Sequence, residues 1–276
     1  MTFSIVGAVG DACGVAVASK FLSAGAVVPA ARSGVGAVAT QAMAKMSYKD
    51  DVLRLLGDGL SAPEAVAEVT AADPEAAHRQ LGVAAHGSEA TFTGEACLPW
   101  AGGMCGSDDT GRYAVQGNIL VGPEVVAAME KAWLENSRLG LAQRLLAALL
   151  AGDAAGGDSR GRQSAAVYAV KPGTGYDGSG VLMDLRVDDH PEAPRELARL
   201  AELHDMTFGG PEEVQPLQGE LDAEVSACLV RLGYSDPDTA RALAAWAGRE
   251  NFEMRLSPDG IDTKLLAALR SASHAS

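Results

Sequence analysis

Aromatic residues are scarce in this sequence, and long apolar runs and an excess of basic residues are absent. Only 5% of the 276 residues are aromatic although 47% are hydrophobic, so the core must be built from Val, Leu, Ala and Met. No stretch reaches the roughly 18 consecutive apolar residues that a transmembrane helix needs, so we expect no membrane partner. The formal net charge of -14 repels phosphate backbones, which argues against nucleic-acid binding.

Cysteine pairs at metal or redox spacing are also absent. The four cysteines contain no CxxC pair and have no partner histidine at zinc spacing, so buried free thiols, no metal and no other cofactor are expected. Asp188, Asp189 and His190 are adjacent, but neighbouring residues of a strand point to opposite faces. We therefore favour a salt-bridged rim or a helix cap over a cation site there.

The N-terminal segment is apolar but does not resemble a signal peptide. It lacks a positively charged first region, and Asp11 and Lys20 interrupt its apolar run. A cytoplasmic location is therefore expected.

The order of the predicted elements favours an α+β fold. Residues 2–9 and 14–20 predict a β-hairpin that turns at Gly10 and Asp11. Further strands are predicted at residues 25–28, 34–40, 81–85, 90–93, 164–170 and 181–187, and helices at 48–56, 62–72, 123–134, 139–151 and 191–203. Short early connections suit antiparallel pairing, which favours layered sheets over a doubly wound parallel sheet.

The composition changes near residue 207 and predicts a second domain. Residues 1–208 form the predicted first domain, and 209–216, which carry prolines and glycines, form the predicted linker. Residues 217–276 contain three helical patterns and are expected to form a small all-α domain.

Thr2 is a candidate nucleophile because of its position. Removal of Met1 would leave a threonine that carries both a hydroxyl nucleophile and an α-amine base with a reference pKa of about 8. A three-residue hairpin loop would place Lys20 opposite Thr2, where its charge could lower the pKa of the amine. A two-residue loop would instead place Ser19 there, and the sequence leaves this register open.

Other candidate site residues lie in two polar segments. The loop "AGGDSRGRQS" offers Asp158 and Arg160, which could pair with each other or hold a substrate carboxylate, and Ser164 begins the next strand. In "VQGN", the Asn118 amide could stabilise an oxyanion, although a turn-forming role is an equal alternative. Arg186 is a second, weaker candidate for a carboxylate contact.

Several segments in order resemble a bacterial family catalogued as domain of unknown function 1028. They are "MTFSIVG", "GVAVASKFLSAGAVVPAA", "GVGAVATQA", "RQLGV", "TGEACLPWAGG", "VQGNIL", "LLAALLAGDAAGGDSRGRQSAA" and "DLRVDDHPEAPRELARL", and they span about residues 1–205. The resemblance implies an N-terminal-nucleophile-hydrolase-like, four-layer αββα sandwich. The segments "LVRLGYSDPDTARALAAWAGRENFEMR" and "GIDTKLLAALR" resemble a peptidoglycan-binding-like three-helix domain.

The same resemblance implies roles for individual residues. Thr2 becomes the nucleophile with Lys20 as its electrostatic helper, and Thr40, Asn118, Asp158, Arg160 and Ser164 become the surrounding shell. We therefore predict an amidohydrolase for a small amide or peptide-like substrate, in a chain that could form homo-oligomers. The alternative is a non-catalytic ligand-binding or scaffold protein on the same fold.

Overall fold

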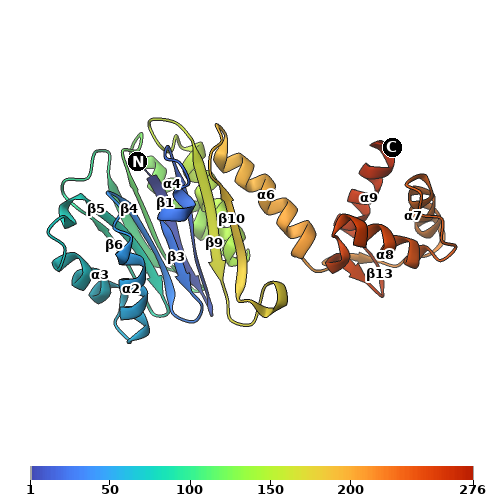
Figure 1. Cartoon of the computed structure of the whole chain (residues 1–276), viewed down its shortest axis with the longest axis horizontal. Coiled ribbons are helices and arrows are strands. Elements are labelled where there is room, and N and C mark those ends of the chain that lie inside the picture. The colour runs from blue at the N-terminus through green and yellow to red at the C-terminus, as the bar shows by residue number, and fades with distance from the viewer. Residues whose placement is uncertain (1, 276) are drawn as a thin grey trace. The chain divides into compact units, whose positions relative to one another are not determined.

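The computed structural model describes residues 2–275. The chain divides into two compact units, the first ending at Leu200 and the second beginning at Ala201. Helix α6 (Ala193–Phe208) contains this boundary (Figure 1). The two units are described separately below.

The first unit contains two antiparallel sheets. The larger sheet has the strand order β10-β9-β2-β1-β8-β7, so β1 lies in its interior with β2 and β8 as neighbours. Its strands are β1 (Thr2–Val9), β2 (Ala12–Ser19), β7 (Gly102–Ser107), β8 (Arg112–Asn118), β9 (Ser164–Val170) and β10 (Val181–Val187). The smaller sheet has the order β3-β4-β5-β6 and consists of β3 (Pro29–Arg32), β4 (Gly36–Ala42), β5 (Arg79–Ala85) and β6 (Ser88–Thr93).

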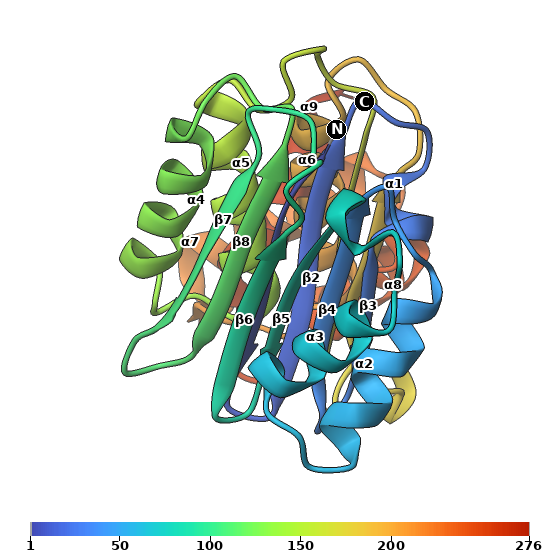
Figure 2. The same ribbon diagram turned by 90° about the vertical axis from the view of Figure 1, so that its left-hand side faces the viewer.

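A pair of helices covers the outer face of each sheet. Helices α2 (Ser47–Gly57) and α3 (Ala62–Ala71) pack on the smaller sheet, and α4 (Glu124–Glu135) and α5 (Leu141–Ala154) pack on the larger one (Figure 2). The predicted capping box of α3 is present, because Ser61 and Glu64 bond each other's backbone amides. The first unit is thus a four-layer αββα sandwich.

Small side chains allow the two sheets to approach each other. The cluster between them consists largely of Val and Ala, including Val15 and Val17 of the larger sheet and Ala37 and Ala39 of the smaller one. A separate apolar cluster lies between the outer face of the smaller sheet and helices α2 and α3, and it includes Tyr48, Leu56 and Leu81. Burial of these apolar surfaces holds the four layers together.

Residues 25–28 are a correction to the predicted strands. Residues Ala24–Val27 form the short helix α1 instead, and strand β3 begins after it. The Ser164 hydroxyl accepts a hydrogen bond from the Ala24 amide and donates one to the Phe21 carbonyl. Ser164 lies about 140 residues further along the sequence, so its hydrogen bonds could not be predicted from the four Ala, Gly and Val residues of this segment.

The second unit contains the three predicted helices and a small sheet that the sequence did not predict. Helices α7 (Gly219–Arg231), α8 (Thr239–Glu250) and α9 (Thr263–Ala275) surround an apolar core that includes Leu229, Trp246 and Leu265. Strands β11 (Val214–Gln215), β13 (Gly260–Asp262) and β12 (Leu256–Ser257) pair in that order. None of the helices in the described part of the chain combines the length and the apolar character needed to cross a bilayer.

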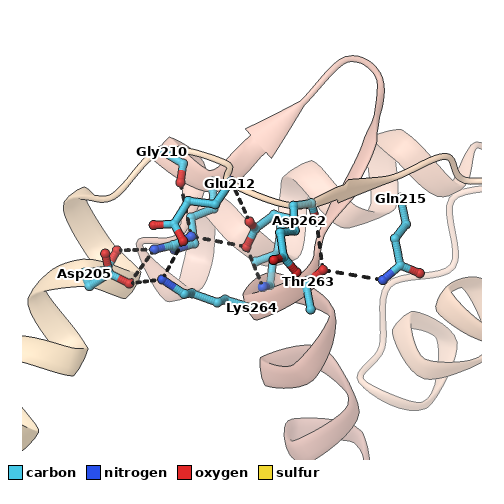
Figure 3. Close-up of polar contacts among 10 residues, drawn as sticks. Asp205, Gly210, Glu212, Gln215, Asp262, Thr263 and Lys264 are labelled. Carbon is cyan, nitrogen blue, oxygen red and sulfur yellow. Dashed lines mark hydrogen bonds and ion pairs between the residues drawn. The ribbon is translucent and has the colours of Figure 1, made fainter. Parts of the chain in front are cut away.

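A charged cluster around the buried side chains of Arg255 and Asp262 fastens the segment that precedes β11 to the rest of the second unit. We call Arg255, Asp205, Asp262 and Lys264 the Arg255 cluster. The Arg255 guanidinium contacts Asp205 Oδ2 at 2.6 Å, Asp262 Oδ1 at 3.3 Å and the Gly210 carbonyl at 3.1 Å. Lys264 reaches Asp205 at 2.8 Å, as Figure 3 shows. The residues between α6 and β11 therefore have specific partners in this unit.

Candidate functional site

Thr2 begins the interior strand β1 and is 7% exposed. Strands β1 and β2 are joined by the two residues Gly10 and Asp11, and Gly10 has the positive φ of 52° that such short hairpin turns require. In this register Ser19 lies opposite Thr2, and their hydroxyl oxygens are 3.0 Å apart. The two-residue alternative is therefore the observed one.

Lys20 does not lie opposite Thr2, and this corrects the register on which its predicted role depended. The Lys20 amide donates to Asp158 Oδ2 at 2.8 Å, and its Nζ donates to the Arg162 carbonyl at 3.3 Å. The side chain is thus bonded to the loop after α5. The turn geometry excludes the three-residue loop that would have placed Lys20 across from Thr2.

Asn118 lies directly opposite Thr2 on the other side of β1. The two residues are register partners in the β1–β8 ladder, and the Asn118 side chain is buried. Asn118 Nδ2 donates to Gln80 Oε1 at 2.9 Å and lies 3.5 Å from the Thr2 carbonyl oxygen. The first bond fixes the orientation of the amide, whereas the second is long enough to be exchanged for a better acceptor.

Three buried glutamines continue this arrangement between the two sheets. We call Gln41, Gln80, Gln116 and Asn118 the amide network. Gln41 Nε2 contacts Gln80 Oε1 at 2.8 Å and the Thr2 carbonyl at 3.2 Å, while Gln41 Oε1 accepts from Ser4 at 2.7 Å. Gln116 Nε2 donates to Ser4 Oγ at 2.6 Å. The network thus links β1 and β8 to strands of the other sheet.

Gln41 and Gln80 are site residues that were not predicted from the sequence. Each stands in an otherwise apolar strand, in "GAVATQA" and "RQLGVAA", where a fully buried amide needs a hydrogen-bond partner. That mismatch was the available signal. It shows that these residues are special but not which strand supplies their partners.

A pocket of about 350 Å³ opens beside Asn118, and we call it the Asn118 pocket. It is lined by Ala42, Met43, His78, Ala96, Cys97, Leu98, Asn118 and Ile119. Ala42 and Ile119 have φ values of 64° and 49°, which place both in the left-handed region that side chains with a Cβ rarely adopt. Such strain persists where the surrounding structure enforces it, and it concentrates at functional sites.

The remaining predicted site residues bond to other parts of the protein. Asp158 accepts from the Arg160 amide at 2.9 Å and pairs with the Arg160 guanidinium at 3.3 Å, which is the mutual pairing that the sequence allowed. Thr40 Oγ1 accepts from the Lys45 amide at 3.3 Å and therefore braces the loop after β4. Ser164 holds the turn before α1, as described above.

Arg186 lies on the edge strand β10, three strands from β1. It pairs with Asp188 at 3.1 Å, in agreement with the salt-bridged rim that we favoured from the sequence. Asp189 accepts from Gln163 Nε2, and His190 Nδ1 accepts from the Glu192 amide. Across residues 2–275 no group of three or more His, Cys, Asp or Glu side chains is arranged to hold a metal ion.

Comparison with known proteins now identifies the first unit. Residues 2–197 match the model of a family described as "Family of unknown function (DUF1028)", which is more than half of the chain. The chain belongs to the DUF1028 family. Residues 207–269 match a model described as "Putative peptidoglycan binding domain". No functionally curated protein matches the chain.

A solved structure agrees with this assignment. A crystal structure of protein SPO2555 from Silicibacter pomeroyi, also a DUF1028 protein, is similar with a TM-score of 0.63 and 29% sequence identity. The similarity covers 80% of this chain and 88% of that one. The similar region therefore exceeds the part of the chain that the DUF1028 model alone matches.

The DUF1028 site combines a buried hydroxyl with neutral donors. Thr2 supplies the hydroxyl, and among the described residues no charged side chain is hydrogen-bonded to it. Cys97 lines the pocket, but burial raises the pKa of its thiol, so it is not a thiolate at neutral pH. The chemistry that this arrangement favours is attack by an oxygen nucleophile with stabilisation from an amide donor.

Proposed function

We propose that the DUF1028 domain hydrolyses an amide bond with the Thr2 hydroxyl as nucleophile. The observation that carries this proposal is the placement of Thr2 opposite Asn118, whose amide is oriented by Gln80 and lines a pocket with strained walls. A fixed donor beside a buried hydroxyl is the arrangement that acyl transfer requires.

The mechanism needs the α-amine of Thr2 as its base. Once Met1 has been removed, this amine takes the hydroxyl proton while Oγ1 forms a bond to the substrate carbonyl carbon. Asn118 Nδ2 then donates to the resulting oxyanion in place of its long bond to the Thr2 carbonyl. The carbon–nitrogen bond breaks as the leaving amine receives the proton, and water hydrolyses the Thr2 ester.

Ser19 takes the position for which Lys20 was predicted. Its hydroxyl lies 3.0 Å from Thr2 Oγ1 and is buried, so it can hold the nucleophile in one rotamer. The carboxylate-binding roles predicted for Arg160 and Arg186 stay predictions. Both guanidinium groups would first have to leave the carboxylates with which they pair.

The first test combines intact mass with active-site labelling. Mass spectrometry of the purified full chain establishes whether Met1 is absent, and incubation with an activated acyl ester then reports a covalent adduct on Thr2. We expect one acyl group per chain in the wild type and in Thr2→Ser, and none in Thr2→Ala. Thr70→Ala is the matched control, because its hydroxyl bonds to the Val66 carbonyl on α3.

The outcomes separate the two functions considered from the sequence. Labelling that persists in Thr2→Ala would sink the nucleophile assignment. A chain that retains Met1 and still binds amide compounds without turnover would instead be a ligand-binding protein on this fold. Sedimentation analysis of the same sample would test the predicted homo-oligomer.

For the second unit, we propose a glycan-containing partner. The support is its match to the peptidoglycan-binding model over residues 207–269. Co-sedimentation of the full chain with purified peptidoglycan tests this proposal, with a chain that ends after Phe208 as the control. Equal amounts of both proteins in the pellet would contradict it.

A further inference from the structure

The geometry points to an uncharged, apolar acyl group as the part of the substrate that enters the Asn118 pocket. This inference rests on the proposed function, since it places the acyl side of the scissile amide in that pocket. The substrate class is thus an amide of an aliphatic acid, with its carbonyl at Asn118 and its chain directed along the apolar wall.

The lining of the Asn118 pocket is mainly aliphatic. Ala42, Ala96 and Ile119 contribute methyl and methylene groups, and Met43 and Leu98 add larger apolar side chains. The polar part of the lining is His78, Cys97 and Asn118. Met43 is 58% exposed and Leu98 is 64% exposed, so the mouth presents apolar surface to solvent. An aliphatic ligand that covers these side chains would remove that surface from water, which favours binding.

Charged groups near the pocket are bonded elsewhere. Arg79 contacts Asp73 at 3.0 Å and the Met43 carbonyl at 2.6 Å, and Lys45 also pairs with Asp73. The Cys97 thiol donates to the Arg79 carbonyl. A substrate carboxylate in this pocket would therefore meet no free guanidinium or ammonium among the described residues, and its desolvation could be offset only by the His78 imidazole of the lining.

Backbone hydrogen bonds fix the pocket walls in place. The Met43 amide donates to the His78 carbonyl at 3.2 Å, and the Ile119 amide donates to the Leu98 carbonyl at 3.1 Å. These bonds hold two pairs of lining residues together across different loops. The pocket is thus formed before a ligand arrives, which lowers the cost of ordering it on binding.

The test measures binding and acylation separately. Thr2→Ala full-length protein is titrated by calorimetry with primary amides from acetamide to decanamide and with succinamate, a short amide that carries a carboxylate. We expect affinity to rise about fourfold per methylene, which is about 0.8 kcal/mol, until the pocket is filled. Succinamate should bind more weakly than butyramide, which has the same carbon number.

A pair of surface variants tests where the acyl chain of the ligand binds. Leu98→Asp places a charge at the pocket mouth and should weaken octanamide binding at least tenfold. Leu139→Asp is the matched control, since Leu139 is also an exposed leucine but does not line the pocket. An equal effect of both variants would overturn the assignment.

The result also separates this inference from the proposed mechanism. Affinity that is independent of chain length, or higher for succinamate, overturns the acyl pocket even if wild-type Thr2 is acylated. Chain-length dependence without any acylation of wild-type Thr2 supports the pocket and removes the nucleophile.

Discussion

Each unit buries a polar cluster, and the two clusters differ in charge and in what they adjoin. The amide network is neutral and reaches a pocket through Asn118, whereas the Arg255 cluster joins a guanidinium to two carboxylates around β13. A neutral amide can exchange a weak partner for a substrate at low cost. A buried charge cannot leave its counter-charge without a large penalty. This difference supports the proposed chemistry at the first cluster and a stabilising role for the second.

The largest expected effect is loss of stability when Arg255 is removed. Arg255→Leu leaves the buried Asp262 carboxylate without its cation, whereas Asp205 keeps Lys264, and the loss should cost about 3–5 kcal/mol of the second unit's unfolding free energy. Urea unfolding monitored through the Trp246 indole NMR signal reports this unit. Lys264→Met is the control, because that exposed ion pair contributes less than about 1 kcal/mol. Equal losses for the two variants would contradict the comparison.

Removal of the Asn118 amide should affect catalysis more than folding. Asn118→Ala takes away the proposed oxyanion donor, so we expect kcat for an octanoyl amide to fall about 100- to 1,000-fold. Asn136→Ala is the control, because the Asn136 side chain donates to the Ala132 carbonyl at the end of α4. An unchanged kcat would show that Asn118 only braces β8.

A methyl group placed beside the amide network should disturb it moderately. A Cβ at Gly82 would lie 2.0 Å from Gln116 Oε1, so Gly82→Ala must displace that side chain. We expect a loss of about 1–3 kcal/mol in the first unit's unfolding free energy. Gly57→Ala is the control, since its Cβ would meet only Arg32 Nη1 at 3.7 Å. Similar thermal melting of the two variants would argue against a tightly packed network.

The smallest expected effect is the loss of stability in acid, which should affect the Arg255 cluster and not the amide network. It is small because it depends on the single carboxyl group of Asp262. Burial alone would raise the pKa of Asp262, but amide hydrogen bonds from Glu212 and Leu265 and the charge of Arg255 outweigh it and lower the pKa. Its stabilisation is therefore present above about pH 3.9, the unfolded value, and is lost as the pH falls toward the lower folded value. The amide network has no titrating group to contribute.

The measurement is the melting temperature of the second unit between pH 7 and pH 3. Between pH 7 and pH 3 the melting temperature of the wild type should fall further than that of Asp262→Asn. The variant should already have the lower melting temperature at pH 7. Parallel curves for the two proteins would show that Asp262 does not carry this dependence.

The sequence predicted local features well and long-range partners poorly. The helix at 62–72 was correct because its capping box lies within four residues. The hairpin was also correct, but the sequence left its register open between Ser19 and Lys20 opposite Thr2, because that register depends on one residue in the turn. Periodicity describes faces of single elements, and it cannot count the residues of a turn.

The amide network shows why the rest of the site could not be found. Thr2 and Asn118 were both named, yet their contact arises only because β1 and β8, 116 residues apart, are neighbours in the sheet. Gln41 and Gln80 join them from the other sheet. The three strands of β11–β13 were missed because each has only two or three residues, which is too short for a periodic pattern.

Strand β1 begins at Thr2, and this has a practical consequence for anyone who expresses the protein. An affinity tag ahead of Thr2 would convert its amine into a peptide nitrogen, which cannot accept a proton. If Thr2 acts as we propose, such a preparation would fold and yet be inert. Tags therefore belong after α9, and a folded but inactive sample is informative only when its first residue has been determined.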